Sequence, residues 1–209
     1  MAMLELIRAT AETWEEAYDV FYRALRKLMT EGRSEFFGGM TPDRVKNSMK
    51  EGNEVFLIYR KHDPMPVAAV SILRLQEQML HEGDRERMEE FLEEQEFNPD
   101  EIRILNAMSV RPELWGQGYG RQALRLCKDY LKKEEGVKGF IGEYHPDDDA
   151  TFATMKYVAA GNKVLTGEEY VWPTPKGRQL PRRRFAFAPS DWRQRPYNAG
   201  EFYLPAFIK

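Results

Sequence analysis

The chain of 209 residues contains few of the residues that cross-link small proteins or bind metals, with one cysteine and three histidines. The single cysteine, Cys127, excludes a framework of intramolecular disulfides and favours the reducing cytoplasm as the compartment. His62, His81 and His145 are scattered, and no pair of Cys or His residues stands at the spacing of zinc ligands. We therefore predict no metal in this protein.

Long apolar runs and charge of one sign are also missing. The longest uncharged stretch, around Val67–Leu73, is far shorter than the ~20 residues that span a membrane. The amino-terminal stretch meets an acidic residue at Glu5 and has no basic region before an apolar run, so it does not resemble a secretory signal. The net charge of −3 does not favour a nucleic-acid partner, and without an apolar run of spanning length we expect no membrane partner.

Apolar and aromatic side chains are present in the amounts that a folded core needs. Hydrophobic residues make up 42% of the chain, which has 12 Phe, 10 Tyr and 4 Trp, too many core formers for a disordered protein. We predict one domain over residues 1–188, with an acidic helical insertion at about 78–100, followed by an aromatic-rich extension over 189–209. The extension is expected to pack on the domain or on a partner subunit of a homodimer.

Charge is distributed unevenly along the chain. Residues 81–96 hold eight acidic and two basic side chains, whereas residues 172–209 hold eight basic and two acidic ones. Such a chain presents either two oppositely charged surfaces, or a solvated helix face and a basic tail that partly neutralise each other.

The spacing of apolar residues predicts strands alternating with helices. The predicted strands cover 4–8, 54–60, 67–73, 102–110, 137–144, 162–172 and 182–188. The predicted helices cover 14–29, a short segment from 42, then 84–95, 118–133 and 148–160. This order indicates an α/β (α+β) fold, a mixed and mostly antiparallel twisted sheet with helices on both faces.

Three local patterns refine these elements. Thr13 with Glu16 three residues later predicts a capping box for the first helix, and Thr41 before Pro42 predicts an N-cap for the second. In the strand 102–110, alternation places Ile102, Ile104, Asn106 and Met108 together on one face.

Two sets of reactive side chains have structural explanations. Cys127 belongs to the apolar stripe of helix 118–133, so we interpret it as a small core residue and not as a nucleophile. Asp147, Asp148 and Asp149 stand at a helix start, where carboxylates accept hydrogen bonds from unpaired amides, so we interpret them as a cap and not as metal ligands.

The most informative stretch lies between a predicted strand and a predicted helix and contains Gly116, Gly118 and Gly120. Closely spaced glycines let backbone approach a ligand, and the unpaired amides of a helix start suit a phosphate or pyrophosphate. Arg121 stands where a dinucleotide-binding turn needs its third glycine, and the Gly-Lys-Ser/Thr of a P-loop is absent. A turn built only for close packing is the alternative explanation.

Two segments resemble a known family. Val110-x-Pro112-x-x-Trp115-Gly116-Gln117-Gly118-Tyr119-Gly120-Arg121 is similar to the acetyl-CoA signature of the GCN5-related N-acetyltransferases (GNAT). Ala153-x-x-Lys156-Tyr157-x-x-x-Gly161 resembles a second segment of the same family. The predicted order of elements also resembles the family fold, from about residue 4 to 188.

The resemblance implies acetyl-CoA as co-substrate and transfer of its acetyl group to an amine, more readily that of a small molecule than of a protein. It further implies that strands 102–110 and 137–144 are parallel and splay apart, and that Met108 and Val110 contact the pantetheine arm through their backbone. Tyr157 would lie beside the thioester sulfur and protonate the leaving thiolate. The amides implied to hold the pyrophosphate are those of Gly116, Gln117, Gly118, Tyr119, Gly120 and Arg121.

The chain departs from the family pattern at four positions. Trp115 replaces the usual Gln or Arg, Ala150 stands where many members have an asparagine, and Asn162 replaces a common phenylalanine. Ile104 occupies the place where some members keep a glutamate as general base.

The general base therefore stays open among Glu143, Glu101 and His145, acting directly or through water. We expect the acceptor amine to lie between the loops 31–40 and 172–181, with Phe36, Phe37 and Trp172 as apolar walls. The acidic helix, folded over the entrance, would favour cationic acceptors.

A protein that binds without catalysis is the alternative function. A degenerate member of the fold would sense acyl-CoA or bind a partner through its acidic insertion or its basic tail. Salt-dependent retention on polyanions without thioester turnover would favour this hypothesis, and steady release of thiol with an amine would exclude it.

Overall fold

The computed structural model describes residues 3–34, 40–50, 53–75, 89–94, 98–134, 136–148, 151, 153–154, 164–173 and 179–187. Several residues singled out by the sequence lie outside these ranges, namely Phe36, Phe37, Ala150, Tyr157, Gly161, Asn162 and the extension 189–209. Within the described ranges, no helix has the length and apolar character needed to cross a membrane.

Strands and helices follow one another along the chain close to the predicted order. The elements are β1 (Leu4–Arg8), α1 (Trp14–Thr30), α2 (Pro42–Asn47), β2 (Glu54–Arg60), β3 (Pro66–Arg74), η3 (Pro99–Glu101), β4 (Ile102–Val110), η4 (Pro112–Leu114), α4 (Tyr119–Leu131), β5 (Gly139–Tyr144), β6 (Val164–Pro173) and β7 (Gln179–Phe187). Residues 89–94 form a further helical segment.

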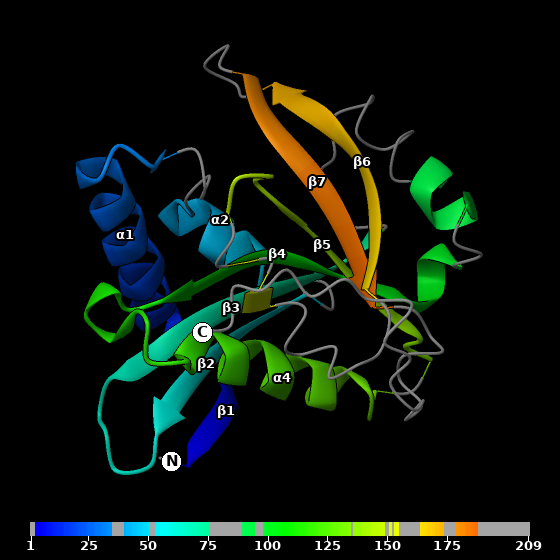
Figure 1. Ribbon diagram of the computed structural model, residues 1–209. Coiled ribbons are helices and arrows are strands. Elements are labelled where there is room, and N and C mark those ends of the chain that lie inside the picture. Colours follow the sequence, from blue (N-terminus) through cyan, green and yellow to red (C-terminus); the bar gives the residue numbers. More distant parts are fainter. Residues whose placement is uncertain are drawn as a thin grey trace.

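The strands form a seven-stranded sheet in the order β1-β2-β3-β4-β5-β7-β6. Neighbouring strands pair antiparallel except for β4 and β5, which run parallel. Figure 1 shows α1 and α2 on one side of the sheet and α4 on the other. This arrangement confirms the predicted fold class.

Helix α1 is amphipathic and covers one face of the sheet. Its buried residues Ala17, Val20 and Phe21 pack with Val55 and Leu57 of β2. The predicted capping box at its start is wrong, because Thr13 makes no side-chain hydrogen bond to the helix. The hydroxyl of Tyr59 donates to Glu16 Oε2 at 2.6 Å, so a strand 43 residues away engages the carboxylate.

Helix α2 begins as the sequence predicts. Thr41 precedes it in an extended conformation, and its hydroxyl oxygen accepts a hydrogen bond from the amide of Arg44 at 3.2 Å. Pro42 occupies the first turn, where a missing amide hydrogen has no cost.

Helix α4 covers the opposite face of the sheet. Cys127 and Leu124 pack with Phe56, Ile58 and Val70 in the largest apolar cluster. Because it is fully buried, the pKa of the Cys127 thiol is raised above its usual value, so the thiolate needed for nucleophilic attack is disfavoured. The interpretation of Cys127 as a core residue is confirmed.

The helical segment 89–94 belongs to the acidic insertion and packs on the sheet through its apolar side chains. Phe91 and Leu92 are buried against Ile104 and Ile141, while the four glutamates of the segment are exposed. The strand neighbours of these isoleucines, Leu105 and Phe140, pack toward α4, so Ile104 and Ile141 face the α1 side. The acidic segment therefore lies on the same side of the sheet as α1.

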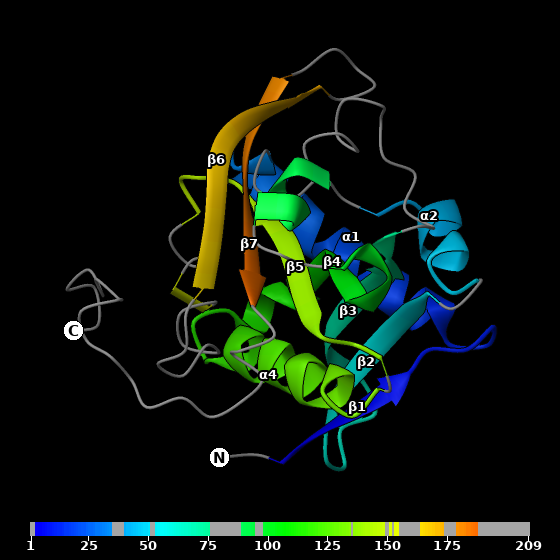
Figure 2. The ribbon, with the colours of Figure 1, turned by 90° about the vertical axis from the view of Figure 1, so that its right-hand side faces the viewer.

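Strands β6 and β7 form a long ribbon at one edge of the sheet (Figure 2). Strand β7 begins at Gln179, earlier than predicted, and includes Pro181, which the sequence placed in a loop. The pairing of β7 with β5 starts only at Arg183, so at Pro181 the strand has β6 as its one neighbour. A proline is tolerated there because an edge strand loses no ladder hydrogen bond.

A buried carboxylate of β2 connects strand β1 and helix α4. Glu54 is 7% exposed. It accepts a hydrogen bond from the Tyr130 hydroxyl at 2.9 Å and lies 3.5 Å from Arg8 Nε. Burial raises the pKa of Glu54, an effect that the Tyr130 hydrogen bond and the Arg8 charge oppose. Burial, together with the neighbouring carboxylate, also raises the pKa of Tyr130 to about 12.

Replacing Glu54 by Gln tests this burial. A raised pKa means that the folded protein holds the proton more tightly than the unfolded chain, so stability is lost as the pH rises from 4.5 through the folded pKa. Glu54→Gln removes that loss, and its melting temperature should improve relative to the wild type between about pH 4 and about pH 7. For a chain of this length, each kcal/mol corresponds to roughly 2–4 °C.

Glu12→Gln is the control, because hydrogen bonds from Thr10 and from its own amide lower the pKa of the exposed Glu12. The melting temperature of Glu12→Gln relative to the wild type should fall slightly as the pH rises, which is opposite to the change expected for Glu54→Gln. If the melting temperatures of Glu54→Gln and the wild type change with pH in parallel, the Glu54 carboxyl has the same pKa in the folded and unfolded states.

Candidate functional site

The parallel pair of strands separates halfway along β4. Residues Ile102–Leu105 pair with Gly139–Gly142, and the ladder between β4 and β5 ends there. Strand β4 continues to Val110 and pairs with β3 up to Ala68. From Asn106 onward, β4 therefore has no strand partner on its β5 side among the described residues, and the predicted splay is confirmed.

A β-bulge lies at the point of separation. Ser71 of β3 pairs with Ala107 and Ile72 pairs with Leu105, which leaves Asn106 as an extra residue in β4. The bulge changes the side-chain alternation, because Met108 packs toward the α4 face together with Leu105. The prediction that Met108 shares a face with Ile102 and Ile104 is wrong.

Asn106 is exposed, and its side chain reaches two elements on the α1 side. Its Nδ2 donates to Ser71 Oγ at 3.2 Å and to the sulfur of Met40 at 3.8 Å. Met40 ends the loop that the sequence expects to frame the acceptor. The structure thus brings the end of that loop next to the separation of β4 and β5.

The glycine turn follows at the end of β4. Gly116 and Gly118 have φ of 76° and 81°, the left-handed region that favours glycine. Gly118 is the N-cap of α4, which has no side-chain cap, and a Cβ added at either glycine would meet nothing within 4 Å. The space beside the first amides of α4 is therefore open, as an anion site requires.

Trp115 connects the turn to the strand. Its indole Nε1 donates to the carbonyl oxygen of Val110 at 2.7 Å. The residue that departs from the family pattern thus holds the turn in place through a short contact with the backbone of β4, and it takes one lone pair of the Val110 carbonyl.

The side chains of Gln117 and Tyr119 are engaged within the protein. Gln117 Nε2 donates to the carbonyl oxygen of Glu113 at 3.2 Å. Arg60 of β2 hydrogen-bonds to Asp63 and to Tyr119, and these contacts raise the pKa of Arg60. The backbone amide of Gln117 is engaged as well, because it donates to the carbonyl oxygen of Leu114 at 3.4 Å.

The three candidate bases lie in different surroundings. Glu101 precedes β4 at the end far from the splay, and its carboxylate pairs with Lys138 Nζ at 2.5 Å. The His145 side chain is 6% exposed, and its Nδ1 accepts a hydrogen bond from the amide of Asp147 at 3.2 Å. Glu143 of β5 is exposed on the face of Ile141, the α1 side, just beyond the last β4–β5 pair. Position alone favours Glu143.

The capping interpretation is confirmed for Asp148 alone, and Asp149 lies outside the described residues. The two carboxylate oxygens of Asp148 accept from the amide and the hydroxyl of Thr151, at 3.1 and 2.6 Å. Among the residues that the structure places, no three His, Cys, Asp or Glu side chains gather as they would around a metal ion.

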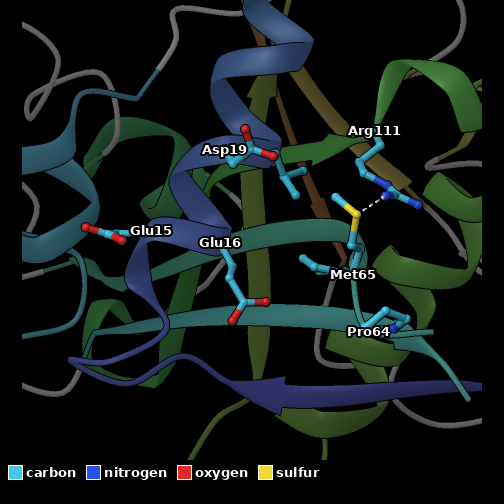
Figure 3. Close-up of a pocket in the computed structure, with 8 residues that line it drawn as sticks. Glu15, Glu16, Asp19, Pro64, Met65 and Arg111 are labelled. Carbon is cyan, nitrogen blue, oxygen red and sulfur yellow. Dashed lines mark hydrogen bonds between the residues drawn. The ribbon is translucent and has the colours of Figure 1, made fainter. Parts of the chain in front are cut away.

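A pocket of about 320 Å³ lies beside the other end of the β4 edge, between the start of α1, the β2–β3 turn and Arg111. Figure 3 shows Glu16 and Asp19 of α1 on one side and Met65 with Arg111 on the other. Arg111 Nη1 donates to the sulfur of Met65 at 3.5 Å, and Asp19 pairs with Arg23. Some of the charged side chains that line this pocket are thus engaged within the protein. The candidate site is instead the place where β4 and β5 separate.

Sequence reasoning identified the glycine turn and missed Asn106. The signal was present, since Asn106 is the one amide side chain in the strand Ile102–Val110. The sequence does not show how β4 pairs with β3, so side chains that alternate regularly through Asn106 predict a strand without a bulge.

Comparisons with known proteins agree with this geometry. The sequence profile described as "Acetyltransferase (GNAT) family" matches residues 14–153, more than half of the chain. No curated protein sequence gives a significant match.

Solved structures share the fold at low sequence identity. The ribosomal-protein-S18-alanine N-acetyltransferase from Escherichia coli has a TM-score of 0.59 and 17% identity, over 88% of this chain and 92% of that one. Aminoglycoside acetyltransferase AAC(6')-Ib in complex with coenzyme A and kanamycin has a TM-score of 0.61 and 12% identity, over 91% and 97%. The yncA protein from Salmonella typhimurium, with its cofactor acetyl-CoA, has a TM-score of 0.58 and 11% identity, over 94% of this chain and 98% of that one.

Replacing Trp115 by Phe should loosen the turn. The substitution keeps the aromatic ring but removes the donor to the Val110 carbonyl, so the free energy of unfolding in urea should fall by about 1 kcal/mol. Gln117→Ala removes an exposed hydrogen bond on the same turn and should change it by less than ~0.5 kcal/mol. Equal effects of the two variants would show that the indole bond has no special structural role.

Proposed function

Because this chain belongs to the GNAT acetyltransferase family, we propose that it transfers the acetyl group of acetyl-CoA to the amine of a small, cationic acceptor. The observation that carries the proposal is the open edge of β4, which begins where β5 departs after Leu105 and Gly142. That edge leads directly to a helix start without a side-chain cap.

The open edge and the turn fit the shape of coenzyme A. An extended pantetheine arm with two amides can pair with strand backbone in the manner of an added strand, here with Met108 and Val110. The pyrophosphate suits the amides of residues 116–121, since Gly116 and Gly118 leave the space beside them open. No lysine or arginine is required at the pyrophosphate, because the helix start supplies the donors.

Two side chains have proposed roles in proton transfer. As the acetyl group moves, a C–N bond to the acceptor forms, the C–S bond of the thioester breaks, and the amine loses one proton. Tyr157 is proposed to give its hydroxyl proton to the leaving sulfur. Glu143 is proposed to receive the proton of the amine, directly or through water, because it is exposed on the α1 side beyond the last β4–β5 pair.

The charge near this face supports a cationic acceptor. The segment 89–94 is held on the α1 side by Phe91 and Leu92, and it presents four exposed glutamates. Such a group attracts cations over a distance that shortens with salt. The kanamycin complex of one structural neighbour is consistent with an acceptor of this kind.

A thiol-release assay tests the proposal. Acetyl-CoA is incubated with kanamycin, spermidine and a peptide that begins with alanine, and free thiol is followed with a colour reagent at two ionic strengths. We expect turnover with kanamycin or spermidine above the hydrolysis background, and a higher KM at higher salt. A rate that no amine raises would contradict acetyl transfer.

Acetyl-CoA should stabilise the folded protein. At a concentration 100 times its Kd, a ligand adds about 2.7 kcal/mol, or roughly 5–10 °C in melting temperature for a chain of this length. Gly118→Val should abolish that shift, because its side chain would occupy the space beside the α4 amides. The variant itself should lose about 1–2 kcal/mol, since the left-handed φ of 81° strains a residue with a Cβ.

Gly120→Ala is the matched control. Gly120 is helical, and a Cβ there would make an ordinary contact of 3.8 Å with Val110 Cγ2. This variant should fold at least as well as the wild type and keep the full acetyl-CoA shift. Loss of the shift in Gly120→Ala but not in Gly118→Val would place the anion elsewhere.

Tyr157→Phe separates binding from chemistry. If Tyr157 protonates the leaving thiolate, the variant should keep the acetyl-CoA melting shift while kcat falls by about 10²-fold. An acyl donor with a better leaving group should restore part of the rate. Unchanged kcat would assign Tyr157 a structural role.

A further inference from the structure

A buried arginine with unused hydrogen-bond donors lines the pocket beside α1. Arg111 is 7% exposed, and its Nε is enclosed without a hydrogen-bond partner. Among the described residues, its one ion pair is with Glu113, whose Oε1 lies 3.5 Å from Nε and whose side chain is 53% exposed. Of the five donors of a guanidinium group, this one uses a single hydrogen on Nη1, toward the weakly accepting sulfur of Met65. A buried cation with donors to spare suits an anionic partner.

Two carboxylates of α1 line the opposite wall of the pocket (Figure 3). Glu16 and Asp19 are three residues apart, so their side chains lie on the same face of the helix. Glu16 Oε2 accepts a hydrogen bond from the Tyr59 hydroxyl at 2.6 Å, and Asp19 Oδ2 accepts one at 2.6 Å from an arginine of the same helix. No described residue donates to the second oxygen of either carboxylate. Two free carboxylate oxygens suit a cation with several N–H donors, such as an ammonium group.

Apolar side chains cover the rest of the pocket. Val20 of α1 is 1% exposed, and Pro64, Met65 and Pro66 come from the turn between β2 and β3 and from the start of β3. The volume of about 320 Å³ lies near the lower end of the range of ligand pockets, which is about 300–1,000 Å³. The pocket therefore suits a small ligand with an apolar part.

This pocket is distinct from the splay of β4 and β5. The amide of Arg111 donates to the carbonyl oxygen of Val67 in β3 at 3.0 Å. Strands β3 and β5 flank β4 on opposite sides, and the turn that supplies Met65 connects β3 to β2, still further from β5. A ligand in the pocket thus contacts the β3 side of β4, and it does not compete with acetyl-CoA on the β5 side.

We propose that the pocket binds a free α-amino acid with an apolar side chain. The carboxylate of the amino acid accepts from Nη2 of Arg111, which has no partner among the described residues, and its ammonium group donates to the free oxygens of Glu16 and Asp19. Its side chain packs on Val20 and Met65. An anion alone would meet the two carboxylates, and a cation alone would leave the buried guanidinium without a partner. The site does not depend on the proposed acetyl transfer.

Methyl signals of the methionines test the assignment, with L-leucine as the probe. When L-leucine is titrated into the full chain with labelled methionine methyl groups, the Met65 signal, identified with Met65→Leu, should shift to saturation. The signal of Met29, which is exposed at the far end of α1 and does not line the pocket, should stay in place. A Met65 signal that shows no saturable shift up to the solubility limit of L-leucine would overturn the proposal.

Two analogues of the probe separate its charges. L-Leucinamide at pH 7 keeps the ammonium group and lacks the carboxylate, whereas 4-methylpentanoate keeps the carboxylate and lacks the ammonium group. Each should bind at least about tenfold more weakly than L-leucine, because each leaves one charged wall of the pocket without its partner. Either analogue binding as tightly as L-leucine would overturn the amino-acid assignment.

Variants of the two walls connect the signal to the proposed contacts. Arg111→Met keeps an unbranched side chain and removes the guanidinium group, and the Kd of L-leucine should rise at least about tenfold. Glu16→Gln should raise it by a similar factor, and this variant keeps an oxygen for the Tyr59 hydroxyl if the arginine variant does not fold.

Glu5→Gln is the matched control, because it removes the same charge at an exposed position on β1. It should leave the Kd of L-leucine unchanged. An unchanged Kd in Glu16→Gln would contradict the proposal, and so would an equal rise in Glu16→Gln and Glu5→Gln, which would be an effect of net charge.

Discussion

The structure depends on an incomplete backbone ladder between two central strands. Strands β4 and β5 share four paired positions, Ile102–Leu105 with Gly139–Gly142, although β4 continues to Val110. Unpaired backbone groups inside a sheet are costly unless water or a ligand satisfies them. The gap lies at the centre of the sheet, with the bulge and the glycine turn at its two ends, and it is the place that we propose for an extended molecule with amide groups.

The two faces of the sheet differ in how completely they are covered. Toward α4 the sheet is closed by the largest apolar cluster, in which Cys127 is a packing residue. Toward α1 the cover is interrupted near the splay, where Asn106 and Glu143 are exposed and the acidic segment 89–94 packs alongside. The helix start at the turn and the acidic side chains on the α1 face favour ligands of opposite charge, which suits the proposed reaction between an anionic thioester carrier and a cationic amine.

Features that rest on local sequence were predictable, and those that rest on distant contacts were not. Helical spacing identified α1 and α4, the glycines identified the turn, and Thr41 identified the cap of α2. The capping box does not form, since Thr13 makes no side-chain hydrogen bond to the helix and Glu16 accepts a hydrogen bond from Tyr59 of β2. The bulge at Asn106 was hidden because it exists only in the register with β3. Candidate-site residues on the turn followed from a motif, whereas Asn106 needed the three-dimensional pairing.

The width of the gap is set by a strand that lies outside the residues matched to the family. Strand β5 pairs with β7 through five positions, from Phe140 to Tyr144, and these include Glu143 and Tyr144, which have no partner in β4. Once β4 and β5 diverge, the second half of β5 follows β7, because there its backbone finds hydrogen-bond partners. The family profile ends at residue 153, while β7 covers Gln179–Phe187. The carboxy-terminal ribbon therefore holds β5 away from β4, and the open edge that we assign to the pantetheine arm depends on a segment far along the chain from the glycine turn.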